Sequence, residues 1–267
     1  MVVLGIEYDG TNYVGWQIQS NGLSVQQLIE QAISVVAAQP VSTICAGRTD
    51  SGVHALGQVV SFTCANERQP KAWVRGCNSN LPRDVRVVWA RQVDDSFSAR
   101  FSAIQRHYRY LIYNRPAGSA VFARQLLHQP RDLDVERMQS AANALIGTHD
   151  YSSYRAVACQ AASPVRTIRR LDVNRREYVV EVNVSADAFL HHMVRNLVGV
   201  LMAIGIGERP IEWSSEVLTA RDRRRGGVTA PPNGLYLVGV DYPDWSAAEN
   251  ENLQLTMNSV WSGCDPS

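Results

Sequence analysis

Extended segments alternate with amphipathic helices along both halves of this 267-residue chain, and the alternation limits the folds open to it. In the first half, Ser24 and Gln27 form a capping box, and apolar residues then recur at helical spacing as far as Ala38. Segments typical of strands lie on either side of this helix, and short turns join several of the strands. Short turns favour antiparallel or mixed pairing over a purely parallel sheet. The pattern predicts an α+β protein with mixed or antiparallel sheets flanked by helices.

The second half repeats this plan, which suggests two similar α/β domains with RRM-like halves around a central basic cleft. A chain of this length accommodates two domains. We expect an N-terminal domain over residues 1–103 and a C-terminal domain over residues 104–243. The last segment, 244–267, is acidic and sparsely apolar, and we expect it to form a mobile tail.

The pattern predicts the structure of three further segments. We expect a strand at Val41–Ala46, a long polar loop at 148–164 and the most apolar helix of the chain at Ala188–Gly205. The longest apolar run, Leu197–Ile206, is about half as long as a membrane span requires. The opening residues lack the basic and apolar pattern of a signal peptide. We therefore expect a cytoplasmic protein without a membrane segment.

Positive charge is concentrated in the middle of the chain, although the formal net charge is only +1. Residues 97–176 contain 13 arginines and five acidic residues, and arginines alternate with aromatic residues in Ser96–Arg115. Guanidinium groups bind phosphates and aromatic rings stack on unpaired bases, so this mixture favours RNA as a partner. The low net charge excludes a uniformly basic coat protein. The same segment also fits an ordinary strand with one side facing solvent, so composition alone leaves both interpretations open.

The five cysteines do not indicate a redox or metal site. Their number is odd and none forms a C-x-x-C pair, so we interpret them as reduced thiols. The sequence also lacks the closely spaced Cys and His residues of a structural zinc site. We expect neither a metal nor a cofactor.

The segment Cys45–Gln58 concentrates reactive side chains on one glycine-rich loop between two strand-like runs. Its glycines allow the backbone to turn sharply and to approach a ligand closely. Arg48, Asp50 and His54 lie between them. The loop lacks the lysine and the following helix of a phosphate-binding loop. Asp50 and His54 could form a metal pair only with a third ligand, and His54 is more simply interpreted as a hydrogen-bonded loop histidine.

The apolar helix expected at Ala188–Gly205 contains an arginine and two histidines. Arg195 is costly in such a helix unless it is paired. It either extends to solvent or pairs with a loop carboxylate such as Asp50. His191 and His192 are adjacent, so in a regular helix they point to different faces and do not easily serve one site together.

Four segments, in order along the chain, resemble the TruA family of tRNA pseudouridine synthases. They are YDGTNYVGWQ, GRTDSGVHA, RHYRYLIYN and FLHHMVRNLVG, and the resemblance runs from about Val3 to Tyr242. It implies a cofactor-free isomerase that converts uridine to pseudouridine at positions 38, 39 and 40 of the tRNA anticodon stem-loop. It also implies tRNA as the partner and a homodimer of two-domain protomers.

The resemblance assigns roles to the residues that match the family's motifs. Asp50 falls on the catalytic aspartate, and Arg195 falls on the arginine that pairs with it. Arg48 would help to extrude the target nucleotide, and Tyr108 would pack against the flipped base. By position, the candidate tRNA contacts are Arg68, Phe97, Ser98, Ala99, Arg100, Phe101, Ala158, Cys159, Gln160, Ala161 and Ala162.

Two other functions would fit parts of the sequence. A catalytically silent RNA-binding protein built from RRM-like sheets fits the strand rich in arginine and aromatic residues, but gives no role to Arg48, Asp50 or Arg195. A hydrolase-like α/β enzyme would need a G-x-S-x-G motif, which the sequence lacks. For an isomerase, the carboxylate could act as a nucleophile or could remove the C2′ proton so that a glycal forms.

Overall fold

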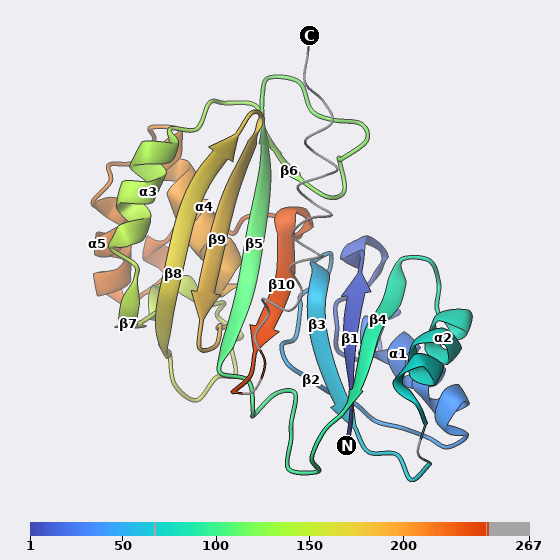
Figure 1. The fold of residues 1–267 in the computed structure, drawn as a ribbon. Coiled ribbons are helices and arrows are strands. Elements are labelled where there is room, and N and C mark those ends of the chain that lie inside the picture. The colour runs from blue at the N-terminus through green and yellow to red at the C-terminus, as the bar shows by residue number, and fades with distance from the viewer. Residues whose placement is uncertain (67, 244, 246–267) are drawn as a thin grey trace.

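The computed structural model describes residues 1–66, 68–243 and 245. Within them, a ten-stranded sheet is flanked by five α-helices (Figure 1). The strands are β1 (Val2–Tyr8), β2 (Ile44–Cys45), β3 (His54–Phe62), β4 (Val85–Gln92), β5 (Gln105–Asn114), β6 (Leu127–Gln129), β7 (Gly147–Asp150), β8 (Val165–Arg176), β9 (Val179–Ala186) and β10 (Leu235–Asp241). The helices are α1 (Val25–Ala37), α2 (Pro70–Asn80), α3 (Val135–Asn143), α4 (Met193–Gly205) and α5 (Trp213–Ala220). The predicted mixed sheet flanked by helices is confirmed.

The two halves of the sequence meet along β10. The strand order is β4-β1-β3-β10-β5-β9-β8-β7, with β2 paired to β3 and β6 paired to β5. Pairing is antiparallel except between β3 and β10 and between β5 and β6. In Figure 1, α1 and α2 lie beside the β4 end of the sheet, and α3, α4 and α5 lie beside the β7 end. The boundary at residues 103 and 104 stays a prediction, and the predicted tail, 244–267, lies outside the described residues except for Trp245.

Local chemistry explains the first helix. The Ser24 hydroxyl accepts a hydrogen bond from the Gln27 amide at 3.3 Å, which satisfies one amide at the helix start. Val25, Ile29 and Ile33 then fall on one buried face. The helix ends at Ala37, one residue from the expected position.

Helix α4 forms the centre of the other half, and most of its side chains are buried. It is 13 residues long, and no helix in the described part of the chain is both long and apolar enough to cross a membrane. A loop packs directly on it at Gly199, where a β-carbon would lie 1.9 Å from the carbonyl oxygen of Val228. Glycine at this position therefore allows the loop to run against the helix.

Three of the local expectations were wrong. The strand expected at Val41–Ala46 is reduced to β2, because side chains of α1 accept the amides of Val41 and Thr43. The segment 148–164 is not wholly a loop, since it contributes to β7, an edge strand whose polar residues conceal it in the sequence. The helix expected from Ala188 begins only at Met193.

Candidate active site

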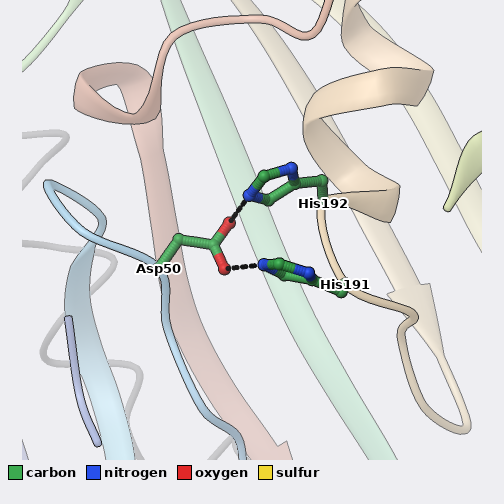
Figure 2. Close-up of side chains that lie close together, drawn as sticks. All are labelled: Asp50, His191 and His192. Carbon is green, nitrogen blue, oxygen red and sulfur yellow. Dashed lines mark ion pairs between the residues drawn. The ribbon is translucent and has the colours of Figure 1, made fainter. Parts of the chain in front are cut away.

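The glycine-rich loop between β2 and β3 is held in place by backbone contacts on both sides. The Trp16 amide donates to the carbonyl oxygen of Thr49 at 3.0 Å, and the Val53 amide donates to that of Asp50 at 3.1 Å. Gly52 completes the turn at φ +77°, a conformation that favours glycine. The Asp50 side chain is thereby directed across the sheet toward α4 (Figure 2).

Arg195 of α4 lies against Asp50. Its Nη1 is 3.2 Å from Oδ2 of Asp50, and its Nε donates to the carbonyl oxygen of Ala230 at 2.7 Å. The arginine side chain is 13% exposed and the aspartate 23% exposed. The pairing with the loop carboxylate is therefore the arrangement adopted, and it offsets the cost of removing a cation from water.

His191 and His192 both face the same carboxylate (Figure 2). Nε2 of His191 lies 3.4 Å from Oδ1 of Asp50, and Nε2 of His192 lies 3.4 Å from Oδ2. The expectation that the two rings point to different faces was therefore wrong. His192 has φ +61° and precedes the helix, which begins at Met193, so the helical alternation does not apply.

The His192 ring is partly removed from water, and this burial lowers the pKa of its imidazole. The negative charge of Asp50 opposes the effect, whereas His191 and Arg195 add to it. Because the ordinary histidine value already lies below neutrality, a lowered pKa leaves His192 uncharged at neutral pH.

Tyr108 of β5 is buried at the side of this site. Its ring packs edge-on against Phe189, with 5.0 Å between ring centroids. The hydroxyl faces Gly47 in the same loop as Asp50, where a β-carbon would lie 3.5 Å from it. Burial raises the pKa of Tyr108, and the charge of Asp50 raises it further, so the phenol is protonated at neutral pH.

Arg48 is exposed and makes no hydrogen bond or ion pair with any residue that the structure describes. Its guanidinium is available to a ligand, in contrast to that of Arg195. Arg68 is likewise exposed, just before α2, and no contact in the described structure joins it to Asp50.

The segment Phe97–Phe101 is tied to the loop that carries Asp50. Arg106 is the link, because it donates to the carbonyl oxygens of Ala46 and Arg100. Phe101 is 78% exposed, with the Arg100 guanidinium 5.2 Å from its ring centre. The other three residues are less accessible: Phe97 packs on Tyr242, Ser98 donates its amide to Ser102, and buried Ala99 donates its amide to Ser61.

The segment 158–162 lies near the histidine pair, since the Ala156 amide donates to the carbonyl oxygen of His191 at 2.8 Å. Its exposed residues are Ala158, Gln160 and Ala162, and its partly buried residues are Cys159 and Ala161. Sequence reasoning missed the orientation of both histidines and the role of Arg106 as a link. For Arg106, the arginine-rich strand was the available signal.

His54 does not join Asp50 in a metal pair. It is 2% exposed, its Nδ1 accepts the Gly10 amide at 3.0 Å, and its Nε2 contacts the carbonyl oxygens of Arg124 and Asn233 at 3.2 Å. The interpretation as a hydrogen-bonded histidine is confirmed. The site thus combines one accessible carboxylate, a fixed cation beside it and a buried tyrosine. This arrangement suits nucleophilic or general-base chemistry.

Comparisons with known proteins agree on one family. A family model described as "tRNA pseudouridine synthase" matches residues 5–102 and 141–243. The protein named tRNA pseudouridine synthase A from Pseudomonas aeruginosa is 57% identical over 243 residues, which cover 91% of this chain and 85% of that one. The proteins of the same name from Nitrosococcus oceani and Alcanivorax borkumensis are 54% and 49% identical, covering 91% and 94% of this chain and 94% and 95% of theirs.

Proposed function

The chain belongs to the tRNA pseudouridine synthase family, and from this premise we propose that it isomerises uridine to pseudouridine at positions 38, 39 and 40 of the tRNA anticodon stem-loop. The observation that carries the proposal is the ion pair between Asp50 and Arg195 at 3.2 Å, on the loop and the helix that hold two of the resembling motifs. The substrate is tRNA, and we further propose a homodimer in the cytoplasm.

The reaction moves one glycosidic bond within a single nucleotide. The C1′–N1 bond breaks, the uracil turns, and a C1′–C5 bond forms, while C5 loses a proton and N1 gains one. Asp50 supplies the carboxylate that acts at the ribose, either as a nucleophile or as the base that removes the C2′ proton. Charge develops near the anomeric carbon in both routes, as it does in glycoside hydrolysis.

Arg195 serves as a positioning residue in this scheme. Its guanidinium donates through Nε to the Ala230 carbonyl oxygen and through Nη1 to the Asp50 carboxylate. The backbone at Ala230 therefore fixes the orientation of the guanidinium. The carboxylate is then aimed before substrate arrives, which avoids reorganisation during the reaction.

The target base must leave the stack, because C1′ and C5 are obstructed while it is stacked, and extrusion costs a few kcal/mol. Exposed Arg48 is the group that we assign to this step, and buried Tyr108 forms the wall against which the flipped base packs. Arg68 and the segments 97–101 and 158–162 are proposed to hold the surrounding RNA. Of these residues, Phe101 has the exposed ring suited to stacking on a base.

A pseudouridine map of unmodified tRNA, before and after incubation with the pure protein, tests the proposal. We expect new pseudouridine at positions 38 to 40 with the wild type and none with Asp50→Asn. Asp94→Asn is the matched control, because Asp94 is an exposed aspartate on another loop. Salt-sensitive tRNA binding without any product would overturn the proposal in favour of a silent RNA-binding protein.

A further inference from the structure

The two histidines beside Asp50 have no assigned part in the isomerisation, yet both point their Nε2 atoms at its carboxylate (Figure 2). We propose that Asp50, His191 and His192 form a binding site for a Zn²⁺ ion, and that the ion inhibits the enzyme by occupying the carboxylate. The binding part of this proposal rests on geometry alone. The inhibition part rests on the proposed function.

The spacing of the ligand atoms suits zinc. Each Nε2 is 3.4 Å from a carboxylate oxygen, and one ligand atom from each residue lies within 4.8 Å of the other two. Zinc binds nitrogen and oxygen at about 2.0 to 2.2 Å, so tetrahedral ligands are about 3.3 to 3.5 Å apart. A separation of 3.4 Å is long for an N–H···O hydrogen bond, but it fits two ligands of one ion. The two rings face different oxygens of Asp50, so an ion held by both rings binds the carboxylate through both oxygens or after a small rotation of it.

The ligand types and their exposure also favour a borderline transition metal. Two imidazoles and one carboxylate are typical zinc ligands, whereas Mg²⁺ and Ca²⁺ prefer oxygen alone. The side chains of His191 and His192 are 42% and 29% exposed, so an ion can enter from solvent. Three protein ligands leave a fourth position for water.

Arg195 limits how tightly the ion binds. Its guanidinium lies 3.2 Å from Oδ2 of Asp50 and repels a divalent cation, whereas Oδ1 faces His191. We therefore expect reversible binding in the micromolar range rather than a resident structural ion. A bound ion takes the electron pair that Asp50 needs at the ribose, which is the reason for inhibition.

Direct metal binding is the first test. The metal-depleted full-length protein is titrated with Zn²⁺ by calorimetry and with Co²⁺ by visible absorption. We expect one site whose cobalt spectrum lacks a thiolate charge-transfer band, since no cysteine is a ligand. His191→Gln and His192→Gln should each weaken binding by about tenfold or more, because each removes one of three ligands.

His128→Gln is the control, since His128 is an exposed histidine on β6. It should bind zinc as the wild type does, and circular dichroism verifies that all three variants are folded. Asp50→Asn provides a second ligand variant with a conservative change of shape. Unchanged affinity in both histidine variants, or a thiolate band with cobalt, would place the ion elsewhere and overturn the site.

Activity is measured separately at buffered free Zn²⁺. Inhibition of the wild type should follow the same concentration dependence as binding, be unaffected by His128→Gln and reverse on chelation. Zinc binding without inhibition of an active enzyme would overturn the inhibitory part. If the protein makes no pseudouridine at all, the proposed function fails while the calorimetry and cobalt spectra still decide the metal site.

Discussion

Asp9 and Asp50 both lie beside histidines, but the histidine beside Asp9 is buried in the fold, whereas the two beside Asp50 reach solvent. His54, beside Asp9, is 2% exposed, and polar groups of the backbone contact both its ring nitrogens. The histidines beside Asp50 lie 3.4 Å from its oxygens and are far more accessible. Nearly every buried polar group in a folded protein has a partner, so a satisfied pair such as Asp9 and His54 contributes to stability. The rings beside Asp50 remain open to solvent, so this carboxylate can act on a ligand instead.

The largest expected effect is a difference in turnover between the variants of Asp50 and Asp9. Asp50→Asn should reduce turnover by about 10³-fold or more, equivalent to about 4 kcal/mol of transition-state stabilisation, because the reacting group is lost. Asp9→Asn should leave turnover within about threefold, because Asp9 contacts His54 and Thr11 and no contact in the described structure joins it to Asp50 or Arg195. Both rates are measured as pseudouridine formed per enzyme under saturating tRNA. Comparable losses in the two variants would contradict the distinction.

The next effect concerns Arg195, the arginine that fixes the Asp50 carboxylate. Arg195→Lys keeps the charge but cannot bond both Ala230 and Asp50 in the same geometry, so kcat should fall by about 10- to 100-fold with little change in KM. Arg223→Lys is the matched control, because Arg223 also contacts α4, through Asn196, but has no contact with Asp50 in the described part of the chain. An Arg195→Lys enzyme with normal kcat would mean that the ion pair is only structural.

Much of the fold follows from local sequence signals, and the candidate site follows in part. The capping box at Ser24 and the apolar spacing after it predict α1 closely, because both act over a few residues. The loop around Asp50 was predicted from its glycines, and the cost of an unpaired cation in an apolar helix suggested a partner for Arg195. Each of these signals lies within a short stretch of the chain and does not depend on distant contacts.

The remaining features depend on contacts that the sequence does not display. The shared direction of the two histidines arises from a positive φ at His192, in a residue other than glycine. The strand expected at Val41–Ala46 is shortened because Ser34 and Glu30 of α1 take up its amides. The joining of the two halves along β10 requires a pairing between Tyr236 and His54, 182 positions apart in the numbering.

The burial of His54 should contribute measurably to stability. His54→Ala removes a fully buried ring, leaves the Gly10 amide without its partner and loses stacking on Tyr236 at 4.7 Å. We expect the free energy of unfolding to fall by about 2 to 4 kcal/mol. His128→Ala, at an exposed histidine, should change it by less than about 0.5 kcal/mol. Urea unfolding of both variants measures the difference, and equal values would remove the structural role of His54.

The smallest expected effect is the acid sensitivity of the Asp9–His54 pair. Contact with His54, and then hydrogen bonds from Thr11, hold the pKa of Asp9 below its ordinary value. The folded state therefore binds fewer protons than the unfolded state, so this contribution is fully present above the unfolded pKa of about 4 and is lost as pH falls toward the folded value. Because the Asp9 side chain is 38% exposed, solvent screening should keep the contribution below about 1 kcal/mol.

Urea unfolding of the wild type and Asp9→Asn, from about pH 6 down to about pH 3, measures this contribution. The difference in unfolding free energy between the two proteins should shrink as the pH falls. Acid protonates Asp9 in the wild type and so removes its negative charge, which the substitution to asparagine removes at every pH. Asp94→Asn should show no such convergence, since Asp94 is an exposed aspartate outside the pair. A difference that stays constant down to the lowest pH would mean that Asp9 stabilises the fold through its shape and hydrogen bonds rather than through its charge.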